Sequence, residues 1–434
     1  MLLIYLPEIT SRCNYVFDLI FEQELGIQYD TTADITTFQN YAGQKINYSN
    51  SRFTNEFFIK STTLLFEKEI KAQRIPITSK HQTRILFPNE NCDLGFDIFS
   101  SVFYLVSRYE EYLPSTQDEY GRFRAQDSLA FKNDFLHLPV VNIWINIFSN
   151  FLQKKFPSLK LNKSIFKAIL TYDVDVAYKY SGRSFVRTFG SAIKDVFAFN
   201  IRKINERIKV LNRDQKDPWD TFEDLKQIIL THNLTTIFFF LMSDKSAHDR
   251  NLNHKNPAMK RLINYIESFA GIGIHPSFYS SLIPNKITIE KKRLEKISDK
   301  IIVKSRQHYL KFILPDTYNY LITAGITEDY SMGFAGVAGF RAGTCKPFYF
   351  YDLKEEKQTH LKIFPITFME GTMINLSLNP GEALENILSL LKEVRNVGGT
   401  FISIWHNQTI SKTDEYEKWR TVHEKMITEL VQYL

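Results

Sequence analysis

The sequence predicts an α/β protein in which a distorted (β/α)7-type barrel follows a smaller α+β domain. From Lys167 onward, apolar β-like runs alternate with helical stretches at spacings suited to parallel βαβ units. The chain has 434 residues, which is long for one domain, and its hydrophobic fraction of 44% is enough for large cores. We therefore expect an N-terminal α+β domain at residues 1–158 and the barrel at residues 159–434.

Composition excludes several classes of function. The formal net charge of +6 is small for this length and the basic residues are spread along the chain, which argues against a nucleic-acid partner. The cysteines (Cys13, Cys92, Cys345) are odd in number and unpaired in spacing, as in proteins of reducing compartments. No apolar run approaches the ~20 residues of a membrane span, and the opening Met1–Glu8 reads as a strand. We expect a cytoplasmic protein that at most associates peripherally with an anionic surface.

The first domain is predicted to be structural. A helix is expected over residues 14–25, ending at Gly26, and short β-like runs follow at Gln44–Ser49 and Phe57–Ile59. Apolar residues recur at three- and four-residue steps in Phe96–Leu113, the pattern of an amphipathic helix. No group of residues in this part carries chemistry by itself.

The second domain is predicted to be built on parallel strands. The expected strands are Lys167–Asp173, Thr235–Met242, Gly271–His275, Ile301–Ser305, Ile326–Tyr330, His360–Thr367 and Thr400–Trp405. The expected helices are Asp220–Thr231, Asn256–Ala270, Pro315–Ala324 and Gly381–Val397. About seven parallel strands with intervening helices favour a closed or nearly closed barrel.

Two carboxylates end the first of these strands. Side chains alternate along a strand, so Asp173 and Asp175 point to the same side while Val174 points back into the fold. Two adjacent carboxylates repel each other unless a cation or a shared proton lies between them. The pair suits a metal ligand beside a general base, and the alternative is a turn in which the aspartates cap backbone amides.

Histidines follow other strands of the same domain. His275 ends the third expected strand, His308 follows the fourth and His406 follows the last. A single histidine after a strand is more often structural. In parallel α/β folds, however, reactive groups collect at the carboxyl ends of strands, and three histidines converging with an aspartate pair favour a metal-assisted hydrolytic site.

Four segments resemble the motifs of a known family. They are Thr171–Asp175, Gly273–Ser277, Gly339–Thr344 and Ile404–Asn407, in that order. Together they resemble the polysaccharide deacetylases (carbohydrate esterase family 4, the chitooligosaccharide deacetylase homology domain) between residues 160 and 434. The part before residue 158 resembles an uncharacterised domain that precedes such deacetylase-like domains in some bacterial proteins.

The chain departs from the family pattern at two points. The family's adjacent aspartates are here separated by Val174, and the second histidine of the metal motif is replaced by Tyr279. Strand alternation still lets both carboxylates face the site. His308 is the candidate replacement for the missing imidazole, because it ends the neighbouring strand.

The resemblance implies hydrolytic removal of an N-acetyl or other acyl group from a carbohydrate or sugar conjugate. A divalent metal, zinc first and cobalt or nickel as alternatives, would be held by Asp175, His275 and His308 and would activate water. Asp173 would be the general base and His406 the general acid.

The resemblance also implies supporting residues. Arg341 would keep Asp173 ionised and aimed, although a salt bridge that closes a glycine-rich loop explains it as well. Tyr279 and Trp405 would stack on the sugar, or else pack in the fold, and Glu370 would orient a partner at the substrate side.

Two other functions stay open. The chain could be a catalytically inactive deacetylase-like protein that binds a glycan or a partner, or another small-molecule amidase on the same fold. A cytoplasmic location would favour a nucleotide-linked or lipid-linked sugar over a polymer. The sequence does not indicate the oligomeric state.

Overall fold

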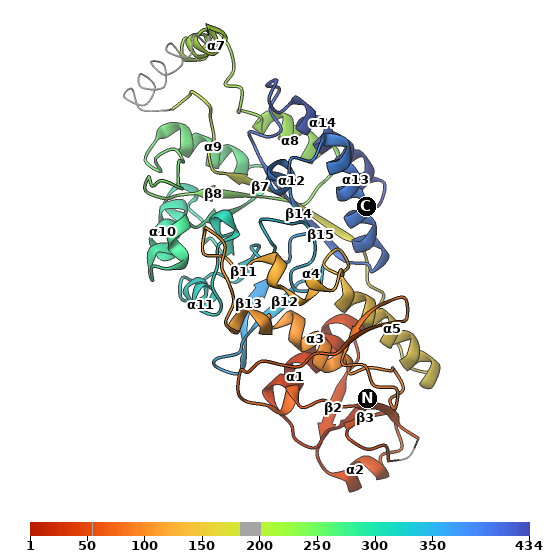
Figure 1. The fold of residues 1–434 in the computed structure, drawn as a ribbon. Helices are drawn as coiled ribbons and strands as arrows, with labels where there is room; N and C mark the ends of the chain where they lie inside the picture. The colour runs from red at the N-terminus through yellow and green to blue at the C-terminus, as the bar shows by residue number, and fades with distance from the viewer. Residues whose placement is uncertain (54, 183–200) are drawn as a thin grey trace.

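A computed structural model describes residues 1–53, 55–182 and 201–434 of the chain. In these residues a four-stranded and a nine-stranded sheet, both built mainly of parallel strands, are flanked by helices. Figure 1 shows the smaller sheet beside the N-terminus and the larger one toward the C-terminal part of the chain. The expected mixed α/β class is confirmed.

The N-terminal sheet is parallel throughout. Its order is β2-β1-β3-β4. The strand bounds are β1 Leu2–Tyr5, β2 Tyr29–Thr32, β3 Lys45–Ser49 and β4 Phe57–Lys60. Parallel strands need crossover connections: α1 lies in the one between the neighbours β1 and β2, and α2 lies in the one between β2 and β3, which flank β1. The α+β prediction for this part therefore needs correction, because its main sheet is of the parallel α/β kind; the two-stranded antiparallel β5-β6 hairpin lies beside it.

Helices and one hairpin complete the N-terminal part. The remaining elements are α1 Ser11–Phe17, which continues as a π-helix over Asp18–Leu25, α2 Ile35–Asn40, β5 Ile77–Lys80, β6 Thr83–Leu86, α3 Ile98–Val106, α4 Leu129–Lys132 and α5 Val140–Lys155. The first helix ends at Gly26, as expected, where φ is 67°. Helix α3 is shorter than predicted because Arg108 adopts a left-handed φ of 56° and a 3-10 turn replaces the last helical turn.

The larger sheet carries the strand-end residues singled out in the sequence. Its order is β12-β13-β11-β10-β9-β8-β7-β15-β14, and every neighbouring pair is parallel except β12 with β13. The strand bounds are β7 Lys167–Val174, β8 Thr236–Leu241, β9 Gly271–His275, β10 Lys304–Ser305, β11 Glu328–Asp329, β12 Phe348–Asp352, β13 Lys357–Ile363, β14 Phe368–Met369 and β15 Thr400–His406. In the described residues no strand pairing joins β12 to β14, so the hydrogen-bonded ladder is open.

The centre of this sheet follows directly from the sequence. All six residues of β8 are buried, and the strand lies between β7 and β9. A continuous apolar run of this kind is typical of a parallel strand that is covered on both faces. The predicted bounds of β8 and β9 agree with the structure to within a residue at each end.

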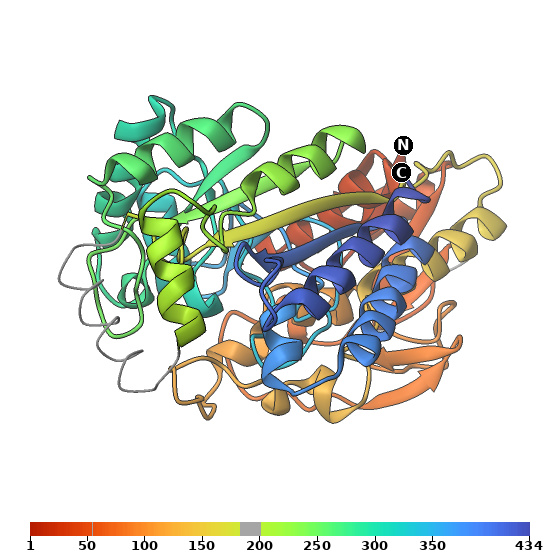
Figure 2. The same cartoon turned by 90° about the horizontal axis from the view of Figure 1, so that it is seen from above.

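Helices cover the sheet. They are α7 Ile201–Leu211, α8 Phe222–Thr231, α9 Pro257–Glu267, α10 Lys286–Ser298, α11 Asp316–Thr323, α12 Glu370–Asn375, α13 Pro380–Asn396 and α14 Glu417–Val431. Figure 2 shows β7 and β15 side by side with α13 and α14 packed along them. Helix α13 begins as predicted, with Pro380 in the first turn and a capping box between Asn379 and Glu382.

One segment of the C-terminal part is held by the N-terminal part. The backbone N–H of Phe340 donates to the carbonyl of Leu136 (2.8 Å), and that of Val141 donates to the carbonyl of Gly343 (2.9 Å). A single buried apolar cluster includes side chains from both parts of the chain. The glycine-rich segment Gly339–Thr344 is therefore part of the contact between the two sheets and their helices.

None of the described helices is long and apolar enough to span a bilayer. Cys13, Cys92 and Cys345 are all buried and none forms a disulfide.

Candidate metal centre

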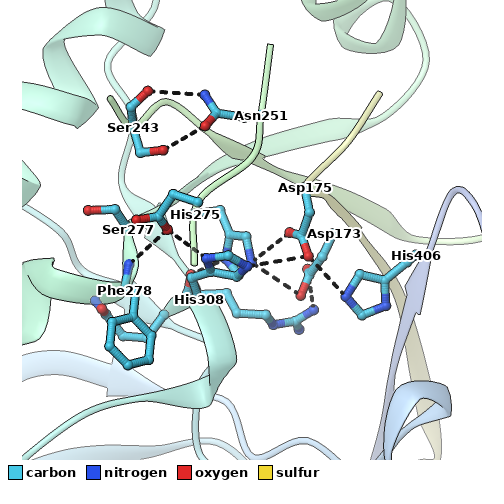
Figure 3. A network of polar contacts seen from close by, with 12 residues as sticks. Asp173, Asp175, Ser243, Asn251, His275, Ser277, Phe278, His308 and His406 are labelled. Atoms are coloured by element: carbon cyan, nitrogen blue, oxygen red, sulfur yellow. Dashed lines mark hydrogen bonds and ion pairs between the residues drawn. The ribbon is translucent and has the colours of Figure 1, made fainter. Parts of the chain in front are cut away.

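Five predicted side chains meet at one edge of the larger sheet. Asp173 and Asp175 end β7, His275 ends β9, His308 follows β10 and His406 ends β15. The carboxyl ends of parallel strands lie at the same edge, which is why residues more than two hundred positions apart converge. Figure 3 shows these side chains pointing toward one another.

Asp175, His275 and His308 could hold a metal ion. One ligand atom from each lies within 4.8 Å of the others. Nε2 of His275 is 3.2 Å from Oδ1 of Asp175, and Nε2 of His308 is 3.4 Å from Oδ2. Among the described residues, Oδ1 of Asp175 is buried without a hydrogen bond. One carboxylate and two imidazoles are a donor set that suits zinc or a related divalent ion, and the carboxylate oxygen that lacks a hydrogen bond is free to bind it.

Both histidines are oriented by bonds to their other ring nitrogen. Nδ1 of His275 is 2.5 Å from the carbonyl oxygen of Arg306, and Nδ1 of His308 is 2.9 Å from Oδ1 of Asp249. When Nδ1 donates to an oxygen, the lone pair of Nε2 is left for a metal. The two imidazoles therefore turn their Nε2 atoms toward Asp175.

Asp249 was missed in the sequence. It is 1% exposed, and it accepts hydrogen bonds from the hydroxyl of Ser246 (2.7 Å) and the backbone N–H of Phe278 (3.0 Å). Asp249 lies in the loop after β8. The feature of the sequence that could have indicated it is its position soon after a buried strand.

Asp173 is aimed by an arginine that the sequence analysis did not assign. Nη1 of Arg306 donates to Oδ1 of Asp173 (2.9 Å) and to Oγ1 of Thr171 (2.6 Å), and Nε donates to the carbonyl of Tyr330 (3.0 Å). Arg306 and Asp173 are both buried. Oδ2 of Asp173 lies 3.7 Å from Nε2 of His275, so the carboxylate borders the metal triad.

Arg341 does not contact Asp173, which corrects the role expected for it. Its guanidinium makes two hydrogen bonds to Glu111, at 2.6 and 2.8 Å, and a third to the carbonyl of Gly333 (2.9 Å). The reason is the position of its loop, which lies against the N-terminal part. The alternative interpretation, a salt bridge that closes the glycine-rich segment, describes the observed geometry.

His406 is bound to Glu370. Nδ1 and the backbone N–H of His406 are both 2.7 Å from Oε1 of Glu370, which also accepts from the hydroxyl of Thr409 (2.7 Å). Nε2 of His406 points toward Asp175, 3.5 Å from its Oδ2. Glu370 is fully buried, so it orients His406 and is not placed to touch a substrate, which corrects its assignment to substrate binding.

Trp405 is not placed to stack on a sugar. It is 0% exposed and packs against the ring of His423, 4.9 Å away. Neighbouring residues of β15 face opposite sides, so with His406 at the site Trp405 must point into the core. Tyr279, by contrast, is 39% exposed and stands beside His248, with 6.0 Å between ring centroids.

Carboxylates and imidazoles of the site shift one another's pKa values toward the charged forms. Burial would raise the pKa of Asp175, but His308, His275 and His406 hold it well below its usual range. Burial would lower the pKa of His308, yet Asp175 and Asp249 raise it to about 9. Burial would also lower the pKa of His406. Glu370, Asp175 and Asp173 outweigh this effect and raise the pKa to about 10.

These shifts describe a site built for positive charge. The carboxylates of the site favour protonated imidazoles as long as no other cation lies among them. A divalent ion bound to Nε2 of His308 would take the place of that proton. The arrangement could thus hold a cation beside a separate histidine, His406, whose protonated form Glu370 favours.

No curated protein matches the chain. Residues 2–157 match a family of unknown function (DUF7033).

Solved structures resemble the chain weakly. A Mycobacterium smegmatis protein provisionally described as a polysaccharide deacetylase is 13% identical with a TM-score of 0.40, over 61% of this chain and 85% of its own. The polysaccharide deacetylase Bc1974 from Bacillus cereus is 10% identical with a TM-score of 0.32, over 62% of this chain and 88% of its own. BA3943 from Bacillus anthracis, a pseudoenzyme of carbohydrate esterase family 4, is 10% identical with a TM-score of 0.30, over 62% of each chain. Scores this low carry no assignment, so function has to follow from the side chains of the site.

Proposed function

We propose that this chain is a metal-dependent hydrolase that removes an N-acetyl or other N-acyl group from a carbohydrate or sugar conjugate. The observation that supports it best is the meeting of Asp175, His275 and His308 beside an independently held carboxylate, Asp173. The proposal includes the division into residues 1–158 and 159–434, with the second part as the barrel-like catalytic domain.

Asp175, His275 and His308 would hold the metal, zinc first and cobalt or nickel as alternatives. A bound divalent ion would supply Lewis acidity for the amide carbonyl and lower the pKa of an attacking water. Tyr279 stands at the family's second histidine position, and His308 offers the third ligand instead. Because His308 completes a set of three ligands, the site favours the enzyme over the inactive glycan-binding alternative.

Asp173 would accept the proton of the attacking water. Arg306 holds one of its oxygens at 2.9 Å and leaves the other near His275. The hydrogen bond from Arg306 fixes the carboxylate and leaves Oδ2 toward the metal triad, which is where a general base has to lie.

His406 would give a proton to the leaving amine. Glu370 fixes its Nδ1, so Nε2 is the nitrogen that carries the proton toward the site. The adjacent Glu370 carboxylate raises the pKa of His406 against the effect of burial, which favours the imidazolium form that acts as an acid.

Acetate release tests this proposal. The metal-loaded protein is incubated with N-acetylglucosamine oligomers and with nucleotide-linked and lipid-linked N-acetylated sugars. We expect acetate from at least one substrate, loss of activity on chelation and recovery on adding zinc. Asp173→Asn should retain the metal and release no acetate. No acetate from any substrate, or an active Asp173→Asn protein, would contradict the proposal.

A further inference from the structure

An aromatic cluster stands beside the metal centre. It consists of Tyr120, His248, Phe278, Tyr279 and Tyr309, called here the aromatic wall. Phe278 is at its base, 5% exposed and stacked on His248 at 3.9 Å between ring centroids. Tyr120 lies 5.2 Å from Tyr309 and 6.2 Å from Phe278.

The wall is joined to the candidate ligands by sequence and by bonds. Tyr309 follows His308 directly, with 4.6 Å between their rings. The backbone N–H of Phe278 donates to Asp249, the carboxylate that orients His308. A group resting on the wall would therefore lie next to the reacting atoms.

Tyr120 comes from the N-terminal part of the chain. The loop that carries it follows α3, and in Figure 1 the orange segment after α3 extends toward the larger sheet. Arg122 secures this loop: it pairs with Asp118 (2.7 Å) and donates through Nη1 to the carbonyl of Tyr309 (2.7 Å). Its guanidinium also lies over the ring of Tyr120, 4.8 Å from the centroid.

The turn that Arg122 reaches is strained. Tyr309 and Leu310 adopt consecutive left-handed φ values of 63° and 52°. Such a conformation is unfavourable in a residue other than glycine, and it persists where the surroundings enforce it. The contact from the N-terminal loop is one such constraint, and it sets where the ring of Tyr309 stands.

Tyr120 and Tyr309 are both partly exposed, unlike Phe278 beneath them. Among the described residues neither hydroxyl makes a hydrogen bond, so both are available to a ligand. An aromatic face with a polar rim matches a pyranose ring, which has an apolar C–H face and hydroxyls around its edge.

We propose that Tyr120 and Tyr309 form the stacking surface for the sugar ring of the substrate, so that the N-terminal part of the chain supplies a specificity-determining residue to the active site. This inference rests on the proposed function. It assigns to residues 1–158 a role in substrate binding in addition to their packing against the C-terminal part.

Sugar binding in the absence of turnover tests the inference. Saturation-transfer NMR with the tetramer of N-acetylglucosamine is measured on Asp173→Asn protein loaded with zinc. Tyr120→Ala is added in the same background. Tyr41→Ala is the matched control, because Tyr41 is a tyrosine of the N-terminal part that packs against the separate cluster of Leu3, Tyr5 and Phe38. Zinc content and melting temperature are recorded for each protein.

We expect saturation transfer to the ring protons, about tenfold weaker binding in Tyr120→Ala, and binding restored by Tyr120→Trp. Zinc content should not change, and Tyr41→Ala should bind as its parent does. In the active background Tyr120→Ala should raise KM and leave kcat unchanged.

Unchanged binding in Tyr120→Ala, or no transfer to the sugar from its parent, overturns the inference. If sugar binding depends on Tyr120 but the wild-type protein releases no acetate, the proposed hydrolase is overturned and the stacking surface stands. The two failures are therefore distinguishable.

Discussion

Arg306 and Arg341 are both buried and paired with a carboxylate, but they lie in different parts of the structure. Arg306 is 0% exposed and Arg341 is 2% exposed, and each pairs with a buried carboxylate. The partner of Arg306 is Asp173, at the carboxyl end of the central strand β7. The partner of Arg341 is Glu111, in the N-terminal part of the chain.

The surroundings explain the difference. Arg306 follows β10, so it lies at the edge where the strand-end residues of the site collect. Arg341 lies in the segment between β11 and β12, and its guanidinium is packed over the rings of Phe312 (4.2 Å) and Phe334 (4.8 Å). Under the proposed function, the arginine at the strand end holds the general base, whereas the arginine in the loop joins the two parts of the chain.

Replacing each arginine by lysine separates the two roles. Lysine keeps the charge but not the planar fork that makes several bonds at once. Arg306→Lys should lower kcat about 100-fold with zinc content unchanged, because Asp173 is no longer aimed. Steady-state kinetics per folded molecule and metal analysis measure this.

Arg341→Lys is the matched control. We expect kcat close to wild type and an unfolding free energy lower by about 1–3 kcal/mol, measured by denaturant titration. If Arg341→Lys lost kcat as Arg306→Lys did, the motif arginine would act in catalysis and the distinction would fail.

Asp249→Asn tests whether the second imidazole of the triad is held from behind. The amide has no charge to fix the Nδ1 proton of His308. Zinc affinity should fall about 10–100-fold. Competition with a chromophoric chelator measures it. Asp244→Asn is the control, because Asp244 pairs with Arg293 away from the triad. Equal affinities in Asp249→Asn and wild type would show that the geometry at Nδ1 does not matter.

His406 and His423 differ in the same way, because His406 pairs with a charged carboxylate and His423 with a neutral hydroxyl. Glu370 raises the pKa of His406 despite burial, whereas burial lowers the pKa of His423 to about 3, with a smaller contribution from Arg420. Nε2 of His423 lies 2.8 Å from the hydroxyl of Tyr172, a neutral partner.

His423 should therefore destabilise the fold in acid. The folded protein keeps it neutral, while the unfolded chain takes up a proton below its ordinary pKa of about 6.5. Stability is complete above that pH and falls as the pH drops from about 6.5 toward 3, by about 1.4 kcal/mol at pH 5.5. His423→Gln cannot take up this proton. Its unfolding free energy should change less than that of wild type between pH 7.5 and 5.5, and an identical change in both proteins would refute this explanation.

The sequence predicted the parts of the fold and the site that depend on local pattern. The apolar run of β8 and the strand ends at Asp173, His275 and His406 could be located because each pattern is contained in a few neighbouring residues. His308 was selected by the same reasoning, although it lies outside the motifs.

What the sequence did not predict depends on contacts between distant segments. Arg306 lies two residues before His308, but the glycine-rich motif favours Arg341 as the partner of Asp173. Only the placement of the Gly339–Thr344 segment against the N-terminal part shows that Arg341 is turned away. Trp405 is different, because its position follows from local pattern. The alternation that puts Asp173 and Asp175 on one face also puts Trp405 opposite His406.

The most direct test of the central claim is the metal content of four purified proteins. The account predicts about one equivalent of zinc, cobalt or nickel per chain in wild type and in Asp173→Asn, and little in Asp175→Asn and His275→Gln. Equal loss of metal from Asp173→Asn would show that the two aspartates have exchanged roles. No metal in wild type, with none taken up on addition, would contradict the metal centre itself.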